Sequence, residues 1–124
     1  MENKTAFGRQ GEDLAVEFLL KEGYEILERN WYFRHNEVDI LAKDHDTLVV
    51  IEVKTRSGNS YGEPYTAVDF RKQQYLIFAA ERYIYAHDLD LEVRFDIISI
   101  IIDHFGHVTL EHVKEAFHPV ARSR

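Results

Sequence analysis

The sequence predicts one domain of the α/β (α+β) class, in which helices flank a mixed central sheet. Hydrophobic residues recur at helical spacing in two segments and at strand spacing in five, in the order α-β-β-β-α-β-β. The 124 residues suffice to bury one core. No repeat, linker or low-complexity segment divides residues 1–124, so we expect a single continuous unit.

A helix and a strand are expected first. The segment GRQGEDLAVEFLLKEGY, residues 8–24, is predicted to be helical, and Gly23 suits the cap that ends a helix. The segment YEILERNWYFR, residues 24–34, is rich in aromatic and β-branched residues and predicts a strand. The apolar stripe of the helix consists of Leu14, Ala15, Phe18 and Leu19.

Two further strands are expected at residues 37–43 and 47–54, joined by a polar turn around Asp44, His45 and Asp46. The loop SGNSYGEP follows at residues 57–64. Together the two strands and their turn predict a hairpin.

Helical spacing returns from about Thr66 to His87, and Thr66 and Asp69 have the spacing of a capping pair. The segment 93–102 is almost continuously apolar, as expected of a strand covered on both faces. The turn DHFGH then leads to a last strand, VTLEHVK, at residues 108–114.

The amino-acid composition excludes few classes of function. Apolar content of 45% with 30% charged residues is ordinary for a soluble protein, and no run approaches the roughly 20 apolar residues that span a bilayer. The absence of cysteine and of an apolar leader in MENKTAFGRQGED fits the cytoplasm. The net charge of −7 argues mildly against a nucleic-acid partner, although a nuclease that collects carboxylates around a metal also looks acidic.

The expected hairpin carries charges inside its apolar runs, namely Asp39, Glu52 and Lys54. Glu52 and Lys54 share one face of their strand because side chains alternate. A turn at residues 44–47, closed by Lys43 opposite Leu48, would place Asp39 opposite Glu52 on that face. A slip of one residue would send Asp39 to the other face.

Two converging carboxylates are suited to a hard cation such as Mg²⁺, and a nearby lysine can orient water or stabilise negative charge. Asp39, Glu52 and Lys54 therefore suffice for metal-assisted hydrolysis of phosphodiesters. The alternative is a solvent-facing salt bridge between Glu52 and Lys54, because half-exposed strands often carry such pairs.

Glu12 is a third candidate acid, since it lies on or beside the buried stripe of the first helix. The alternative is an acid placed near a helix N-terminus by the macrodipole. Cations that could border the carboxylates and contact phosphate are Arg9, Lys54, Arg56, Arg71 and Lys72.

Other polar and aromatic residues are weaker candidates. Gln73 and Gln74 lie early in the second helix, where they could approach the site. Tyr61 and Tyr65 flank the glycine-containing loop and could stack on bases or pack as a lid. His104 and His107 in DHFGH lack cysteine partners, so we do not expect a zinc site there.

The sequence contains the motifs G-R-x-G-E-x-x-A, N-E-V-D-I, V-I-E-V-K-T-R and G-E-P with a following K-Q-Q helix. These motifs extend along nearly the whole chain and resemble those of the YraN-like family of predicted endonucleases. The family is assigned to the PD-(D/E)xK, or restriction-endonuclease-like, superfamily, which includes archaeal Holliday-junction resolvases. The resemblance implies an αβββαβ core, which agrees with the order expected from periodicity.

The resemblance implies that Asp39 and Glu52 are the metal-binding acids, that Lys54 is the lysine of the motif, and that Glu12 matches a helix-one acid of related resolvases. With the carbonyl of Val53, the two acids would hold Mg²⁺ or Mn²⁺. The expected substrate is DNA, branched or single-stranded, with Arg56, Arg71, Lys72 and Gln74 as substrate-binding residues.

Two alternatives remain open beside this nuclease hypothesis. One is a non-catalytic module that retains the fold and binds nucleic acid or protein. The other is a structural domain, in which Asp39 would point away from Glu52. Many relatives of this fold act as dimers, so a homodimer is one expected state, and no membrane partner is expected.

Overall fold

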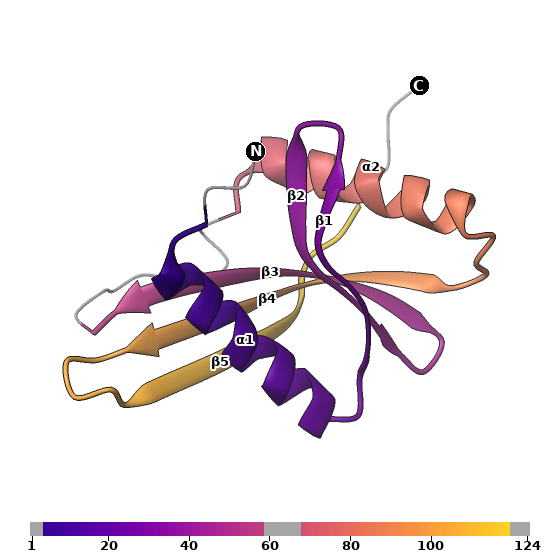
Figure 1. Cartoon of the computed structure of the whole chain (residues 1–124). Helices are drawn as coiled ribbons and strands as arrows, with labels where there is room; N and C mark the ends of the chain where they lie inside the picture. The colour runs from indigo at the N-terminus through magenta and orange to yellow at the C-terminus, as the bar shows by residue number, and fades with distance from the viewer. Residues whose placement is uncertain (1–3, 59–67, 120–124) are drawn as a thin grey trace.

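The computed structural model describes residues 4–58 and 68–119. Figure 1 shows the arrangement of its elements, which follow the expected order. The helices and strands are α1 (Ala6–Lys21), β1 (Glu25–Phe33), β2 (Asn36–Asp44), β3 (Thr47–Ser57), α2 (Phe70–Ala86), β4 (Glu92–Ile102) and β5 (Val108–Phe117).

The five strands form one mixed sheet in the order β1-β2-β3-β4-β5. Neighbouring strands are antiparallel except β3 and β4, which are parallel and are connected through α2. A parallel pair requires such a crossover, because a tight turn can only join antiparallel strands. This arrangement confirms the predicted α+β class and is consistent with a restriction-endonuclease-like core.

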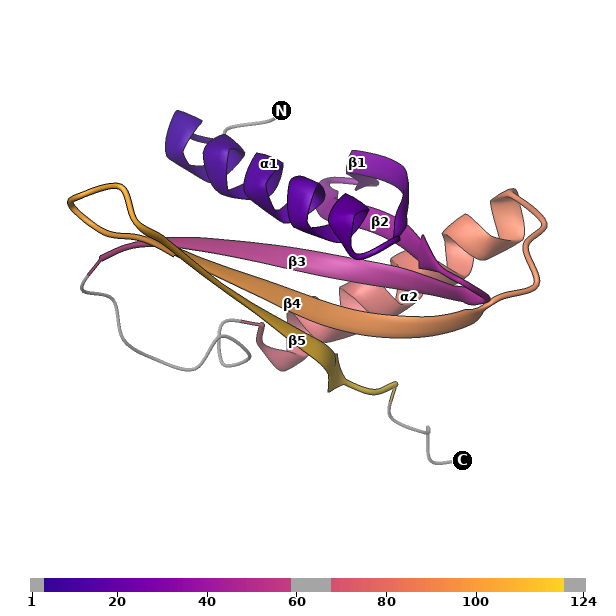
Figure 2. The ribbon, with the colours of Figure 1, turned by 90° about the horizontal axis from the view of Figure 1, so that it is seen from below.

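The two helices cover opposite faces of the sheet, as Figure 2 shows. Alternating residues of β3 supply both cores, with Leu48 and Val50 facing α2 and Val49 and Ile51 facing α1. Strand β4 is buried on both faces from Phe95 to Ile100, as its apolar sequence predicted.

The β2–β3 hairpin has the predicted register, with Lys43 paired with Leu48. The pairing continues to Ile40 opposite Ile51, and the next position in this register is Asp39 with Glu52. Asp44 also pairs with Thr47, so the turn is shorter than the four residues predicted.

Several element ends differ from the sequence-based expectation. The second helix begins at Phe70 and not near Thr66, because the carboxylate of Asp69 accepts a hydrogen bond from the amide of Lys72 and is itself the N-cap. Thr66 lies outside the described residues. Strands β3 and β5 each extend three residues beyond their predicted ends.

Helix α1 lies very close to β3 at Gly11. A Cβ atom at this position would lie 1.9 Å from Thr55 Oγ1 and 2.8 Å from the Thr55 Cβ atom. Only glycine therefore allows this approach, which brings the next residue, Glu12, against the sheet. Among residues 4–58 and 68–119, no helix is long and apolar enough to cross a membrane.

Candidate functional site

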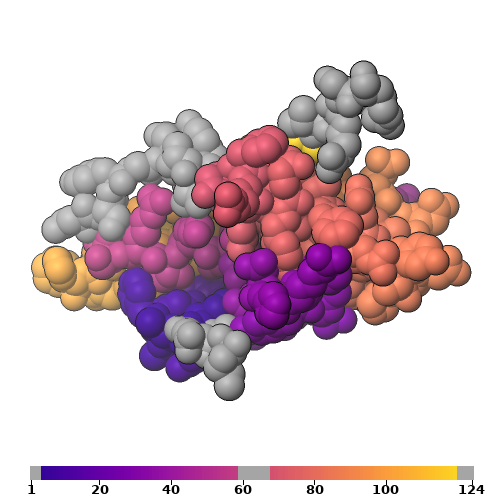
Figure 3. All heavy atoms as spheres, turned by 90° about the horizontal axis from the view of Figure 1, so that it is seen from above, coloured from indigo at the N-terminus to yellow at the C-terminus, as the bar shows by residue number. Residues whose placement is uncertain are grey.

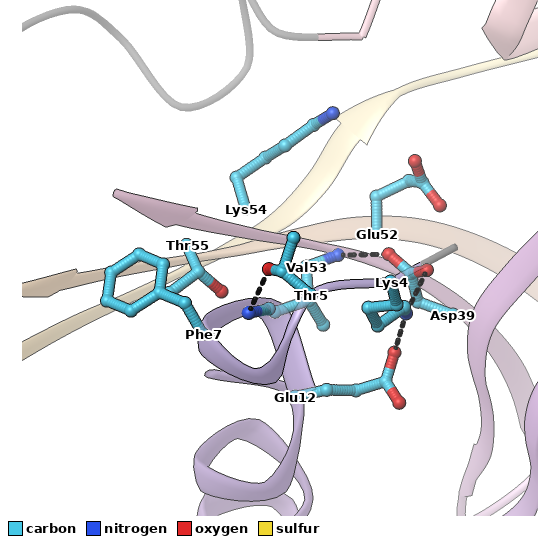
Figure 4. A pocket seen from close by; sticks show the side chains of 10 residues that line it. Lys4, Thr5, Phe7, Glu12, Asp39, Glu52, Val53, Lys54 and Thr55 are labelled. Carbon is cyan, nitrogen blue, oxygen red and sulfur yellow. Dashed lines mark hydrogen bonds and ion pairs between the residues drawn. The ribbon is translucent and has the colours of Figure 1, made fainter. Parts of the chain in front are cut away.

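The candidate residues from distant parts of the sequence meet in one cavity of about 280 Å³. It lies between the start of α1 and the ends of the paired segments of β2 and β3, as Figure 4 shows. Its lining residues are Lys4, Thr5, Phe7, Gly8, Glu12, Asp39, Glu52, Val53, Lys54 and Thr55. The cavity therefore contains all the residues expected to form the catalytic and metal site.

Asp39 occupies the point where β2 and β3 stop pairing. Its Oδ2 atom accepts a hydrogen bond of 2.8 Å from the backbone amide of Val53. This bond replaces a main-chain bond of the ladder, whose last pair is Ile40 with Ile51. Asp39 is thus fixed beside Glu52 and Val53, and both acids line the same cavity, contrary to the purely structural alternative.

Glu52 is almost completely buried, with 5% of its surface exposed. Its Oε1 atom has no hydrogen-bond partner within the described part of the chain. Burial, together with the negative charge of Asp39, raises the pKa of Glu52 to about 7, although the positive charges of Lys72 and Lys54 oppose the shift. Such a carboxylate is poised to accept a cation.

Glu12 is buried against the sheet, with 1% of its surface exposed, which favours the buried position over the simple macrodipole explanation. Asn30 Nδ2 donates a hydrogen bond of 3.0 Å to Glu12 Oε2, and Arg29 Nη2 lies 3.4 Å from Oε1. The two β1 side chains therefore orient the carboxylate from the edge of the sheet, while Gly11 sets how closely the helix approaches.

Lys4 joins the acids and was missed by the sequence analysis. Its ammonium group forms ion pairs with Glu12, with Asp39 at 3.2 Å and with Glu37 at 3.5 Å. Burial alone would lower the pKa of Lys4, but the hydrogen bonds and charges of Glu12 and Asp39 raise it above its ordinary value. A positive charge thus already lies between two of the candidate acids (Figure 4).

The position of Lys4 is set by the chain just before α1. Thr5 is the N-cap of the helix, and its hydroxyl accepts a hydrogen bond of 3.0 Å from the Gly8 amide. Arg9 Nη1 donates a hydrogen bond of 2.6 Å to the Lys4 carbonyl. Because Lys4 precedes the helix, no periodicity marks it, and only the N-cap signal of Thr5 could have located it.

The two lysines near Glu52 come from different elements. Lys54 lies on the same side of β3 as Glu52 (Figure 4), as strand alternation predicted. The ion pair to Glu52 is made by Lys72 of α2, whose Nζ lies 3.5 Å from Oε2. The alternative reading of the sequence expected a surface salt bridge between Glu52 and Lys54. No such ion pair occurs among residues 4–58 and 68–119.

The remaining predicted residues lie outside this cavity. Arg71 and Lys72 border a neighbouring cavity of about 230 Å³ together with Asn36, Asp69 and Tyr75. Arg56 and Gln74 line neither of the two. Tyr61 and Tyr65 fall outside the described residues.

The donors present suit a hard divalent cation that retains water ligands. Within residues 4–58 and 68–119, no three His, Cys, Asp or Glu side chains form a complete metal-binding cluster. Mg²⁺ does not require one, because it is commonly held by one or two carboxylates with waters and phosphate oxygens. The buried Oε1 of Glu52 and the cation already between Glu12 and Asp39 both indicate that a positive charge is favourable here.

Comparison with known proteins gives a consistent assignment. The model of the family described as "Uncharacterised protein family UPF0102" matches residues 11–100. The chain is 45% identical over 118 residues to UPF0102 protein FP2501 of Flavobacterium psychrophilum, covering 95% of this chain and 98% of that protein. It is 46% identical over 116 residues to a UPF0102 protein of Chlorobium chlorochromatii, covering 89% of each. None of these names states an activity.

Proposed function

We propose that this chain, which belongs to the uncharacterised family UPF0102 (the YraN-like family), is a metal-dependent nuclease acting on DNA. One observation carries the proposal. Glu12, Asp39, Glu52 and Lys54 come from three elements and line a single cavity. Glu52 is buried beside Asp39, and its Oε1 atom has no hydrogen-bond partner in the described part of the chain, which costs free energy unless a cation compensates it.

In this proposal each residue has a distinct task. Asp39, Glu52 and the carbonyl of Val53 would hold Mg²⁺ or Mn²⁺, and Glu12 would adjust the ligand shell. Such an ion would lower the pKa of a bound water and offset charge on the phosphoryl group. Lys54 donates hydrogen bonds to the attacking water or to a phosphate oxygen, since it lies on the same side of β3 as Glu52.

The hydrogen bond from Val53 to Asp39 supports this geometry. It uses one carboxylate oxygen, Oδ2, and leaves Oδ1, which now contacts Lys4, to face a cation. The ammonium of Lys4 would have to give up this contact before a divalent ion could bind Asp39 and Glu12 together. The proposal therefore requires that Lys4 be displaced, or that it contact phosphate once substrate is present.

The test is a Mn²⁺ titration with plasmid, single-stranded and four-way-junction DNA. We expect cleavage by the wild-type protein and at least a 100-fold lower rate for Asp39→Ala and Lys54→Ala, since a group that stabilises transition-state charge typically contributes that much. Asp46→Ala and Lys21→Ala, which remove exposed charges elsewhere, should cleave like the wild type. Cleavage that survives both site substitutions would refute the assignment.

A second function, a non-catalytic module that binds nucleic acid or protein, is favoured by one observation. Lys4 already neutralises Glu12 and Asp39, so these acids can be stable without a metal. The same titration separates the two functions. A non-catalytic module binds DNA equally with EDTA or Mn²⁺ and releases no cleavage product at any metal concentration.

A further inference from the structure

A partly exposed surface of aromatic and cationic side chains begins beside the cavity. It is formed by α2 and by the turn between β1 and β2, which Figure 3 shows as one continuous face. We call it the α2–turn surface, and its members are Phe33, Arg34, Arg71, Lys72, Tyr75 and Phe78.

The α2–turn surface is joined to the cavity through Lys72. Lys72 Nζ lies 3.5 Å from Glu52 and 5.8 Å from the centre of the Tyr75 ring. Tyr75 and Phe78 follow Lys72 at intervals of three residues, so all three lie along one side of the helix. A path of contacts thus leads from the buried carboxylate to the exposed part of α2.

Tyr75 fixes the turn between β1 and β2 against the helix. Its hydroxyl lies 2.8 Å from the carbonyl oxygen of Phe33 and 3.0 Å from that of Asn36, so one hydrogen is shared between them. The backbone of Arg34 has φ 62, a value that few non-glycine residues adopt outside tight turns. The turn is therefore held in place before any ligand binds.

Arg34 and Phe78 form an exposed platform of one guanidinium and one aromatic ring. The guanidinium carbon of Arg34 lies 5.2 Å from the ring centre of Phe33 and 5.4 Å from that of Phe78. The two rings meet edge to face at 5.5 Å. Phe78 remains 42% exposed, so its ring is accessible to a ligand.

Cations occupy the space between this platform and the site. Arg71 and Lys72 line the cavity of about 230 Å³ with Asn36 and Tyr75. The one acid in that lining, Asp69, accepts a hydrogen bond from the amide of Lys72 as the N-cap of α2. Two cations and an amide side chain therefore face a space in which phosphate oxygens could bind.

We propose that the α2–turn surface binds a single-stranded segment of the DNA substrate. Unpaired bases stack on the Arg34–Phe78 platform, while Arg71 and Lys72 contact the phosphates that lead to the cavity. Aromatic rings and guanidinium planes stack on bases only when these are unpaired, which excludes the interior of a duplex. The inference rests on the proposed function, since it names the substrate class of that site.

The test measures binding in EDTA, so that it does not depend on catalysis. A single-stranded oligonucleotide with an end label reports affinity by fluorescence anisotropy, and 2-aminopurine within it reports stacking. We expect Phe78→Leu and Arg34→Ala each to weaken single-strand binding by roughly tenfold, the usual effect of losing a stacking partner. Leucine at Phe78 keeps the apolar contact with Phe33 and so preserves the fold.

The matched control lies on the same helix. Tyr85 is 77% exposed, and the guanidinium of Arg82 lies 5.5 Å from its ring centre. Tyr85→Leu thus removes an equivalent cation–aromatic pair outside the α2–turn surface and should leave affinity unchanged. Circular dichroism of each variant confirms folding.

Three results would overturn the inference. They are an equal loss of affinity in Tyr85→Leu, a blunt duplex bound as tightly as the single strand, and a shift from dimer to monomer caused by Phe78→Leu in sedimentation. The last result would assign the surface to a second copy of the chain. The nuclease proposal fails separately, since single strands bound in EDTA but not cleaved in Mn²⁺ support this surface and refute catalysis.

Discussion

At the scale of single residues, the cavity combines two buried acids with an ammonium group that lies where a metal would be expected. Glu12 and Asp39 share the positive charge of Lys4, whereas Glu52 retains a buried oxygen that has no partner in the described part of the chain. The two halves of the site are therefore neutralised in different ways. Lys4 compensates the acids on the α1 side, whereas Glu52 has Lys72 at 3.5 Å and a raised pKa.

Replacing Lys4 tests whether its ammonium competes with a divalent ion. We expect Lys4→Met to raise the affinity for Mn²⁺ by about tenfold, because it removes a positive charge next to two ligands, worth about 1–2 kcal/mol. Isothermal titration calorimetry without DNA measures the change. Lys21→Met, in the last turn of α1, is the control for loss of charge alone and should bind Mn²⁺ like the wild type. Equal affinities for all three proteins would contradict competition.

The raised pKa of Glu52 predicts how stability depends on pH in the metal-free protein. The folded state holds this proton up to about pH 7, whereas the unfolded chain releases it near 4.5. The folded state therefore binds more protons between these values, and stability falls as the pH rises through this window. Glu52→Gln should abolish this fall. Between pH 4.5 and pH 8, the free energy of unfolding of the variant should therefore rise relative to that of the wild type by at most about 3 kcal/mol.

Urea denaturation in EDTA between pH 4.5 and 8 measures this effect. Glu17→Gln, an exposed substitution on α1, should retain the wild-type dependence. A wild-type protein that becomes more stable relative to Glu52→Gln as the pH rises would reverse the sign and show that Glu52 is ionised in the folded state.

At the scale of elements, the position of α1 against β3 controls the shape of the cavity. The helix carries Glu12 and positions Lys4, and it reaches the sheet only because Gly11 has no side chain. The β2–β3 hairpin contributes Asp39, Glu52 and Lys54. Its register places Asp39 level with Glu52, and the pairing of the two strands ends just before these residues, at Ile40 with Ile51. The site is therefore as sensitive to the helix–strand distance as to the acids themselves.

Gly11→Ala tests this dependence. A Cβ atom placed 1.9 Å from Thr55 Oγ1 forces the helix and strand apart, so we expect a loss of about 1–3 kcal/mol in the free energy of unfolding. We also expect weaker Mn²⁺ binding, because Glu12 and Lys4 move with the helix. Gln10→Ala, an exposed neighbour, should change neither property. Urea denaturation and calorimetry measure the two effects, and an unchanged stability would mean that the close approach is not constrained.

Sequence reasoning located the hairpin because its signals were local. The polar turn and the alternation of apolar residues specify one register, because a slip of one residue would move the apolar side chains to the other face. The start of α2 was misplaced, since the spacing of Thr66 and Asp69 suits a capping pair that begins a helix near Thr66, whereas the N-cap of α2 is Asp69. Lys4 could not be found, because its partners are brought to it only by the packing of α1 on the sheet.

At the scale of the whole molecule, a second polar cluster joins β4 to β5. The carboxylate of Asp96 on β4 accepts hydrogen bonds of 2.9 Å from Arg94 Nη2 and 3.1 Å from the Glu115 amide, and lies 2.7 Å from His112 Nε2. Burial would raise the pKa of Asp96, but the hydrogen bonds from His112 and Arg94 lower it. The apolar pattern of the segment 93–102 gave no sign of this cluster.

Asp96→Asn should destabilise the protein without affecting the candidate site. The substitution removes the buried carboxylate that faces Arg94, His112 and the Glu115 amide, while Arg94 keeps Asp44 at 3.2 Å, so we expect a loss of about 1–3 kcal/mol. Urea denaturation measures the loss, and Mn²⁺ binding under native conditions should match the wild type. Asp90→Asn, an exposed substitution, should be neutral. A parallel loss of metal affinity would show that the two clusters are energetically coupled.

The parallel pairing of β3 with β4 has a consequence for synthesis of the chain. Every residue proposed to hold the metal precedes residue 58, yet Glu52 becomes buried only after α2 brings Lys72 and β4 completes the centre of the sheet. Lys72 and β4 both lie in the second half of the sequence, so the ion pair of Glu52 and its cover by β4 require that this half has been made. A chain that ends at residue 58 therefore lacks these surroundings of Glu52.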